Sequence, residues 1–463
     1  MSNEQETRSG RSLDWPMVVL GLVTLIDQVD QNIIRGIEKH LQVEFGLSDF
    51  ALGVLLSSFI FVNGVVTVPA GYLADRLNRT RTIGNTIIGW SGLTVLTAAM
   101  PNFGSMLAVR STLGFGQAIT EPATASLLGD YYEVERRGRA FSVQLVCMIA
   151  GIGLGIALGG AIAETIGWRW AYLIVGPLGL LVAFAAYRLK EPSRGHADRV
   201  SAGIETEPEE EQESQALFEE GIGRFLVNML VGLKNDLRVI FSIPTMRYAL
   251  AGVLGLMFTM NAVGSWLPQY YERQFGLSWL QATSALGAIV MFGGVPAIIM
   301  GGIIADRYAT RIRGARMAIP GYCLLAGSIL LTTSYVFDQF VLAYVFAFAG
   351  FTSVCLAGPA LRAGLSDAVP HNLRGAGFGA FNLMAMTLGA ASAPLVVSLL
   401  SEAYDHNLRT AFLIVTPPVM LSGLLLLRAR NHLDRDMGKI FEAILTAVQE
   451  QQEQDAAPES VHR

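Results

Sequence analysis

The chain is poor in charged residues and in cysteine. Only 15% of its 463 residues are Asp, Glu, Lys or Arg, whereas soluble proteins carry about 25%. Hydrophobic residues make up 52% of the chain. The three cysteines, Cys147, Cys323 and Cys355, lie in apolar runs, so we expect buried packing residues and neither disulfides nor metal ligands. These shortages argue against a soluble domain and against a disulfide-stabilised one.

The sequence also lacks the motifs of several enzyme classes. It contains no Walker-type phosphate loop, no zinc-ligand spacing of His and Cys, and no Ser-His-Asp arrangement. We therefore expect no enzymatic activity, no cofactor and no metal. A membrane hydrolase is disfavoured because no nucleophile–base pair is visible. The N-terminus is polar and the first apolar run is long, so we also expect no cleavable signal.

Apolar runs of about 20 residues fill most of the chain, and each can cross a ~30 Å hydrocarbon core as a helix. The predicted fold class is an all-α membrane protein. Arginine-rich loops alternate with loops that are nearly free of Arg and Lys, which places the basic loops and both termini in the cytoplasm. The twelve predicted spans are 16–37, 50–74, 82–100, 104–128, 140–162, 169–188, 246–270, 280–305, 316–335, 338–364, 375–400 and 408–428.

Two short sequences occur in both halves of the chain. Residues 71–81 (GYLADRLNRTR) match 301–311 (GGIIADRYATR), and residues 130–141 match 367–378 at an offset of 237. The same offset carries Pro122 onto Pro359. A membrane protein with two parallel repeats is a transporter architecture, so we expect twelve helices in two pseudo-symmetric six-helix bundles.

The domain boundaries follow from these spans. The linker carries an acidic stretch at 205–213, predicted to be a solvated tether. Apolar residues at helical spacing then predict amphipathic helices at the membrane surface, one in the linker from Phe218 to Ile240 and one in the tail from Met437 to Val448. The predicted units are an N-terminal tail (1–15), an N-terminal bundle (16–189), a cytoplasmic linker (190–245), a C-terminal bundle (246–428) and a cytoplasmic helix and tail (429–463).

The paired Gly-x-x-Ala-Asp-Arg hairpins resemble those of the major facilitator superfamily. Within it the chain most resembles the Spinster family, whose members move lysophospholipids and sphingosine phosphate. The resemblance rests on the 71–79 motif with its Asn78, on Arg110 followed by 114–118 (GFGQA), on Glu191-Pro192-x-Arg194-Gly195, on Trp266-Leu267-Pro268 and on the tract 373–394.

Two positions depart from the family's pattern. Its first-helix Asp-Arg pair is Asp30-Gln31 here, and its fourth-helix Glu is Gln117, although Glu121 follows one turn later. Both positions are associated with proton coupling and head-group binding. The glycines at 151–160 have the spacing of the superfamily's antiporter motif, with Ile156 where that motif has Pro, and close helix packing explains them equally well.

Charged residues inside spans are the candidates for chemistry, because each costs at least ~2.5–3.5 kcal/mol there. Asp27 and Asp30 share one helix face, and the resemblance implies that the first and fourth helices line a central cavity. Arg110 can neutralise a carboxylate or hold a phosphate, and an aspartate displaced from it takes a proton. The alternative is an ion pair that only joins helices, and Asp27 could be a packing residue.

The second half lacks the counterparts of two of these charges. The offset of 237 carries Arg110 onto Ala347 and Glu121 onto Gly358. Its cavity candidates are aromatic or weakly polar, and each could be an ordinary packing residue. The full predicted set for substrate and protons is Asp27, Asp30, Gln31, Arg110, Gln117, Glu121, Phe258, Asn261, Trp266 and Asn382.

The motif charges are predicted to act as gates. The resemblance implies that the motif aspartate caps a helix of the other bundle and that the arginine pairs with an acidic group at the end of the fourth helix. A carboxylate at a helix N-terminus gains ~0.3–1 kcal/mol, which is weak enough to break in each cycle. The predicted gating residues are Asp75, Arg76, Arg79, Asp130 and Arg137, with Asp306, Arg307, Asp367 and Arg374 as counterparts.

A charged half facing an apolar half suits an amphiphile. We expect a secondary transporter that moves a single-chain anionic amphiphile, such as a lysophospholipid, by alternating access with proton coupling. The alternatives are a proton-driven exporter of drugs or other small molecules, a symporter of small organic anions, and a receptor or scaffold in which Asp30 and Arg110 are dispensable. We expect a monomer surrounded by lipids in a plasma membrane, a bacterial inner membrane, with no nucleic-acid partner.

Overall fold

The computed structural model describes residues 14–74, 77–193, 231, 234, 238, 241–309, 311, 314–368 and 382–456. Every regular element within these residues is a helix. Asp75, Arg76 and Arg374, the acidic stretch of the linker and nearly all of its predicted amphipathic helix lie outside the described residues.

Seven helices form the N-terminal half. They are α2 (Trp15–Phe45), α3 (Asp49–Ala74), α4 (Arg79–Thr97), α5 (Phe103–Gln117), α6 (Thr120–Tyr131), α7 (Val134–Thr165) and α8 (Trp168–Tyr187). The predicted fourth span, 104–128, is therefore divided into α5 and α6 at a turn formed by Ala118 and Ile119. This turn was not predicted, because both residues are compatible with a helix interior.

The C-terminal half contains two spans that are interrupted by π-helix. Its elements are α12 (Pro244–Phe275), α13 (Trp279–Ala288), η1 (Ile289–Gly294), α14 (Val295–Ala309), α15 (Ala315–Ser334), α16 (Phe340–Ala368), η3 (Ala385–Ala390), α18 (Ser392–Ala403) and α19 (Leu408–Ala456). The π-helical segment η1 joins α13 to α14, and η3 precedes α18.

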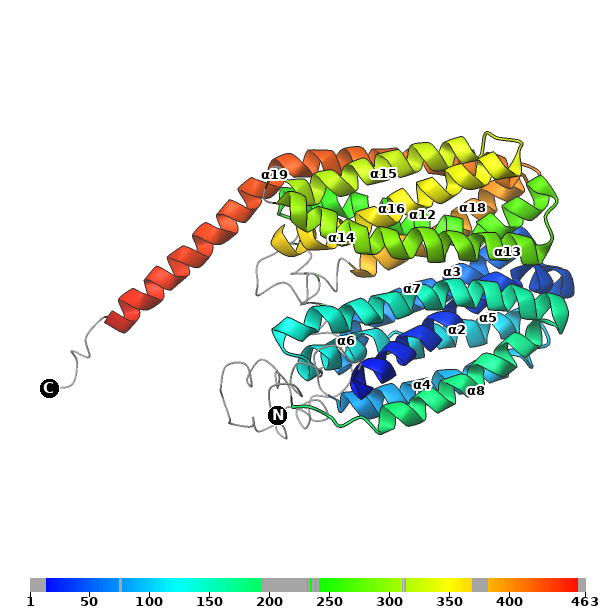
Figure 1. Cartoon of the computed structure of the whole chain (residues 1–463), viewed down its shortest axis with the longest axis horizontal. Coiled ribbons are helices and arrows are strands. Elements are labelled where there is room, and N and C mark those ends of the chain that lie inside the picture. Colours follow the sequence, from blue (N-terminus) through cyan, green and yellow to red (C-terminus); the bar gives the residue numbers. More distant parts are fainter. Residues whose placement is uncertain are drawn as a thin grey trace, which may run out of the picture.

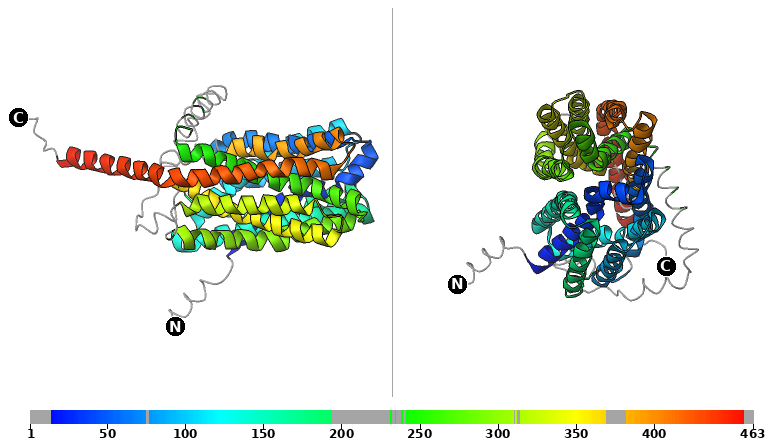
Figure 2. Two further views of the ribbon diagram at one scale, coloured as in Figure 1. Left: turned by 90° about the horizontal axis from the view of Figure 1, so that it is seen from above. Right: turned by 90° about the vertical axis from the view of Figure 1, so that its right-hand side faces the viewer.

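The two halves are separate bundles that lie side by side. Figure 1 shows α2–α8 in one group and α12–α19 in the other, and the end-on view of Figure 2 shows the same division. Within the described residues, ten helical segments are long and apolar enough to cross a membrane. α19 runs on past the bundle as a continuous helix (Figures 1 and 2), so the last span and the tail helix are one element.

Glycine at the contact between α2 and α7 lets the two backbones approach closely. A Cβ on Gly36 would lie 2.4 Å from the carbonyl oxygen of Ile156, and one on Gly159 would lie 2.6 Å from that of Ile33. Gly155 has the same relation to Val29, at 2.7 Å. The glycine run of the fifth span therefore holds α7 against α2, which is the packing interpretation of that motif.

Polar caps set the ends of several helices. Asn78 accepts a hydrogen bond from the backbone N–H of Arg81 at the start of α4, and Asn102 does the same for Ser105 at the start of α5. Gly46 and Gly276 end α2 and α12 with φ of 63° and 67°, in the left-handed region that glycine adopts without a steric penalty. The turns after α2 and α12 thereby fix where α3 and α13 begin.

Candidate substrate and proton site

A cavity of about 280 Å³ lies between the two halves. α2, α3, α5, α6 and α7 supply its lining from the N-terminal half, and α12, η1, α14, α16 and η3 supply it from the C-terminal half. Of the predicted residues it includes Asp27, Gln31, Arg110, Gln117, Glu121 and Asn261. The structure thus brings charged groups of the first and fourth spans together against one wall of the second half.

The three acidic residues that were predicted for the site differ in their surroundings. Asp30 is fully buried and accepts hydrogen bonds from Thr94 Oγ1 at 2.8 Å and from Gln117 Nε2 at 2.7 Å. Asp27 is also buried; its Oδ2 accepts from Gln31 Nε2 at 2.8 Å, and its Oδ1 has no partner in the described part of the chain. Glu121 is exposed and lies within electrostatic range of Asp27.

Arg110 is buried without a hydrogen-bond partner. Its side chain is fully inaccessible, yet Nε, Nη1 and Nη2 make no hydrogen bond within the described residues. Its guanidinium lies 5.4 Å from the ring centre of Phe59 and 5.7 Å from that of Tyr172. It interacts electrostatically with Asp30, but the two side chains share no described hydrogen bond. A guanidinium presents five N–H donors, so this group is poised to bind an anion.

The wall supplied by the C-terminal half is mostly apolar. Its lining includes Met257, Met260, Ile298, Phe351 and Met386. One charged side chain from this half, Arg362 of α16, also reaches the cavity. The comparison of the two repeats predicted only aromatic or weakly polar cavity residues in this half.

Three predicted residues of the second half lie away from the cavity lining. Phe258 lines a small crevice inside the C-terminal half with Leu331 and Phe412. Trp266 is fully buried and donates its indole N–H to the carbonyl oxygen of Pro394 at 3.0 Å. Asn382 lies just before η3 and is half-buried.

Sequence reasoning missed Arg35, which joins the two halves at the cavity. Arg35 donates to Asn32 Oδ1 at 2.9 Å and, across the interface, to Asn261 Oδ1 at 2.8 Å. Gly264 makes room for it, because a Cβ there would lie 2.9 Å from Arg35 Nη1. The signal was present, since Arg35 falls inside the predicted first span, one turn after Gln31.

Apart from the bond between Arg35 and Asn261 at the cavity, the hydrogen bonds that the structure describes between the two halves lie at the end of the molecule where α2 ends and α3 begins. We call this the closed end; it is on the right in Figure 1. At its centre, the buried carboxylate of Asp49 accepts two hydrogen bonds of 2.7 Å from Arg273. It also accepts from Ser401 at 2.7 Å and lies 3.3 Å from His406 Nδ1.

Further contacts surround this ion pair. Lys39 pairs with Glu272, Gln269 donates to Gln42 at 3.1 Å, and Trp279 donates to the carbonyl oxygen of Gly36. The backbone N–H of Phe50 donates to Glu402 at 2.8 Å. The closed end is therefore held by polar contacts that water can replace when the halves separate.

The predicted gating residues that are described tie elements within one half. Arg79, 1% exposed, pairs with Asp130 and with Glu191, which it contacts at 2.8 Å, so α4, α6 and the segment after α8 are joined. Arg137 donates to the carbonyl oxygen of Gly129 at 2.7 Å at the end of α6. In the second half, Arg307 is exposed on α14, while the side chains of Asp306 and Asp367 are outside the described part.

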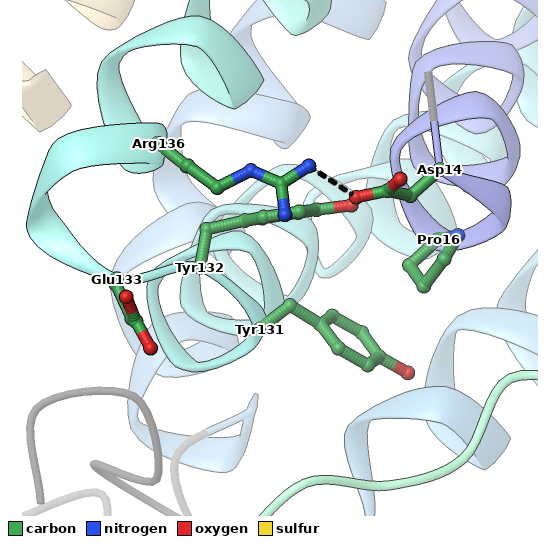
Figure 3. Close-up of a pocket in the computed structure, with 6 residues that line it drawn as sticks. All are labelled: Asp14, Pro16, Tyr131, Tyr132, Glu133 and Arg136. Carbon is green, nitrogen blue, oxygen red and sulfur yellow. Dashed lines mark hydrogen bonds and ion pairs between the residues drawn. The ribbon is translucent and has the colours of Figure 1, made fainter. Parts of the chain in front are cut away.

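A second pocket, of about 320 Å³, lies where α2 starts and α6 ends. Figure 3 shows the Arg136 guanidinium lying over Tyr132, 6.0 Å from the ring centre, and bonded to Asp14 at 2.8 Å. Its lining comes from the N-terminal half alone, so it is not placed to be exposed alternately by movement of one half against the other. Among the described residues, no group of three or more His, Cys, Asp or Glu side chains could hold a metal ion.

Two helical bundles that enclose a cavity and are closed at one end define a secondary transporter. The Major Facilitator Superfamily model matches residues 20–394. The chain therefore belongs to the major facilitator superfamily, a family of integral membrane transporters and not of enzymes.

The relatives include two kinds of transporter. The chain is 24% identical over 445 residues to the probable L-galactonate transporter of Escherichia coli (strain K12), covering 92% of this chain and 91% of that protein. It is 25% identical to the probable sphingolipid transporter spinster homolog 1 of Arabidopsis thaliana, covering 73% and 71%.

A solved structure has the same fold. It is a bacterial homologue of the human lysosomal transporter Spinster in an inward-facing and occupied conformation, with a TM-score of 0.70 and 18% sequence identity. The match covers 91% of this chain and 96% of that one. The predicted fold class and the Spinster resemblance are confirmed.

Proposed function

We propose that the chain transports a single-chain anionic amphiphile, with a lysophospholipid or sphingolipid-like head group, by alternating access and with proton coupling. The observation that carries this proposal is the buried guanidinium of Arg110, which makes no hydrogen bond within the described residues and lies at the edge of a cavity whose opposite wall is mostly apolar.

Arg110 gives the site its preference for an anion. Taking a charge out of water without a partner costs several kcal/mol, and a phosphate or carboxylate that accepts two N–H groups of Arg110 removes much of that cost. Binding of such an anion is therefore more favourable than binding of a neutral or cationic molecule.

The opposite wall favours an apolar portion next to the anionic head. Methionine side chains adapt to irregular apolar shapes, and three of them, Met257, Met260 and Met386, face the cavity. A head group bound at Arg110 leaves its chain against these residues, with the remainder of the chain directed away from the closed end.

Asp27 and Asp30 are the proton-binding candidates. Asp27 Oδ1 is buried without a partner and borders the cavity, whereas Asp30 is held by Thr94 and Gln117 and interacts with Arg110. An anion that engages Arg110 withdraws positive charge from Asp30, which then takes a proton. The alternation of basic loops supports an orientation in which the closed end is on the non-cytoplasmic face, which we propose to be that of a bacterial inner membrane.

The test is a binding measurement on purified protein with labelled lysophosphatidylglycerol. Arg110→Gln should weaken binding about 10- to 150-fold, because hydrogen bonds to charged groups contribute about 1.5–3 kcal/mol. Arg188→Gln is the matched control, since Arg188 is exposed and lies 4.5 Å from the ring centre of Phe184, outside the cavity. Equal binding by both variants contradicts the proposal.

A small organic anion is the second candidate substrate. The cavity of about 280 Å³ carries two further arginines, Arg35 and Arg362, and several amides, including Gln28, Asn63 and Asn261. One relative is a probable L-galactonate transporter. Binding of labelled L-galactonate that unlabelled lysophosphatidylglycerol does not displace would select this candidate. Binding of a cationic drug that is unchanged in Arg110→Gln would instead select the exporter.

A further inference from the structure

Glu38 is a fully buried acidic residue that none of the preceding assignments uses. It lies on α2, one turn after Arg35, and its side chain is 0% exposed. Neither Oε1 nor Oε2 has a hydrogen-bond partner in the described part of the chain. The predicted first span ended at residue 37, so the sequence pattern drew no attention to it.

The groups around Glu38 are already engaged with other partners. Three charged residues interact with it electrostatically: Arg35 on its own helix, Arg273 on α12 and Asp49 on α3. Arg273 and Asp49 bind each other, while Arg35 donates to Asn32 and Asn261.

Gln269 also lies beside Glu38, with its amide near enough to interact with the carboxyl group, but neither oxygen of Glu38 makes a hydrogen bond of ordinary geometry in the described part of the chain. Its amide N–H donates to Gln42, and its carbonyl oxygen accepts from Arg273. Glu38 therefore sits between the cavity arginine and the ion pair of the closed end, without a bond to either.

An ionised carboxylate that is buried without hydrogen bonds is strongly disfavoured, and such a group becomes neutral instead. We propose that Glu38 is a further proton-binding residue, distinct from Asp27 and Asp30, that couples the closed end to the cavity. It holds a proton while the closed end is sealed. When the ties of Asp49 and Lys39 break, water reaches Glu38, the proton leaves to that water, and the carboxylate pairs with Arg35.

This exchange makes the proton and the anion travel together. A neutral Glu38 leaves the positive charge of Arg35 available to an anion in the cavity, whereas an ionised Glu38 neutralises Arg35 and displaces that anion. The anion part of this statement rests on the proposed function. The link between Glu38 and closure does not, because it depends on the buried carboxyl group alone.

The test measures closure without any substrate. Spin labels are placed at Val43→Cys and Tyr404→Cys, which are exposed on opposite halves of the closed end, in a full-length chain without its three native cysteines. The sealed state binds the Glu38 proton more tightly, so it is favoured at low pH and is lost as the pH rises. We expect the population with longer label distances to grow by up to about tenfold per pH unit through the transition.

Neutral replacements separate Glu38 from its titratable neighbours. Glu38→Gln and, as a second neutral variant, Glu38→Met should stay sealed across the pH range. His406 contacts Asp49 and shifts closure in the same sense when it gains a proton, so His406→Asn must keep the pH response. A response in Glu38→Gln or Glu38→Met equal to that of the unsubstituted chain overturns the proposal, as does its loss in His406→Asn alone.

Discussion

Two buried arginines of similar exposure have opposite surroundings. Arg79 is bonded to Asp130, Ser126, Glu191 and the carbonyl oxygen of Pro192. Arg110 has no such bond among the described residues. A fully satisfied guanidinium holds elements together, while an unsatisfied one at a cavity is available to a ligand. The burial of a charge therefore says little about its role until its partners are known.

This contrast predicts different losses for the same substitution. Arg79→Gln leaves Asp130 and Glu191 without their cation and should lower the free energy of unfolding by about 3–5 kcal/mol. Arg110 interacts with Asp30 without a described hydrogen bond, so Arg110→Gln should lower the free energy of unfolding by much less than Arg79→Gln. Thermal unfolding of both variants in the same detergent checks this, and a larger loss for Arg110→Gln would contradict it.

Gly264 is predicted to be needed for the position of Arg35. Adding a Cβ there forces the guanidinium away from Asn261, so Gly264→Ala should weaken anion binding by about tenfold, the equivalent of 1.4 kcal/mol. Gly358→Ala is the control, because its nearest neighbour in the same half lies 4.0 Å away. Titration of the labelled anion compares the two variants, and equal affinities would exclude this role for Gly264.

At the level of elements, two interruptions of regular helix lie at the cavity. Val290 and Gly294 of η1 and Met386 and Ala390 of η3 line it. π-helical turns inside helices are rare and often occur at functional sites. Here the two π-helical segments carry cavity residues where they contact the other half: η1 contacts α7, and η3 contacts α3.

The packing of α2 on α7 gives a prediction about stability. Gly36→Ala places a Cβ 2.4 Å from a backbone oxygen that cannot rotate away, so we expect a loss of about 1–3 kcal/mol from overpacking. Gly89→Ala on α4 meets nothing within 4 Å and should be neutral or stabilising, because alanine favours helix. The midpoints of chemical unfolding decide the matter; a stable Gly36→Ala would show that the two helices can move apart freely.

At the scale of the whole molecule, the polar contacts of the closed end hold one state of the alternating cycle. Arg273→Gln leaves Asp49 buried without its main partner, which should favour the open state by about 3 kcal/mol. Arg169→Gln is the control, because Arg169 pairs with Glu44 of its own half near the same end. The distance between spin labels at residues 43 and 404 is measured in both variants. If Arg273→Gln gives the same distance distribution as Arg169→Gln, this ion pair does not hold the end closed.

The sequence predicts the architecture better than the site. Long apolar runs and the repeated Asp-Arg hairpins are local signals, and the helical two-half fold that they predict is confirmed. Asp30 and Arg110 could be selected because charge in a span is rare. Arg35 lies inside the predicted first span but was not selected. Glu38 was missed because the first helix continues to Phe45, past the predicted end of the span at residue 37. Which arginine is unpaired depends on contacts between distant segments, such as Arg79 with Glu191, and no sequence periodicity encodes them.

The central claim is gradient-driven transport of an anionic amphiphile that needs a proton-binding aspartate in the first span. The most direct measurement is uptake of labelled lysophosphatidylglycerol into proteoliposomes, with and without a pH gradient, by the unsubstituted chain, Asp30→Asn and Arg188→Gln. The account predicts uptake that rises with the gradient in the unsubstituted chain and in Arg188→Gln, and that loses this dependence in Asp30→Asn. Uptake that is absent in all three, or equally gradient-dependent in Asp30→Asn, would contradict it.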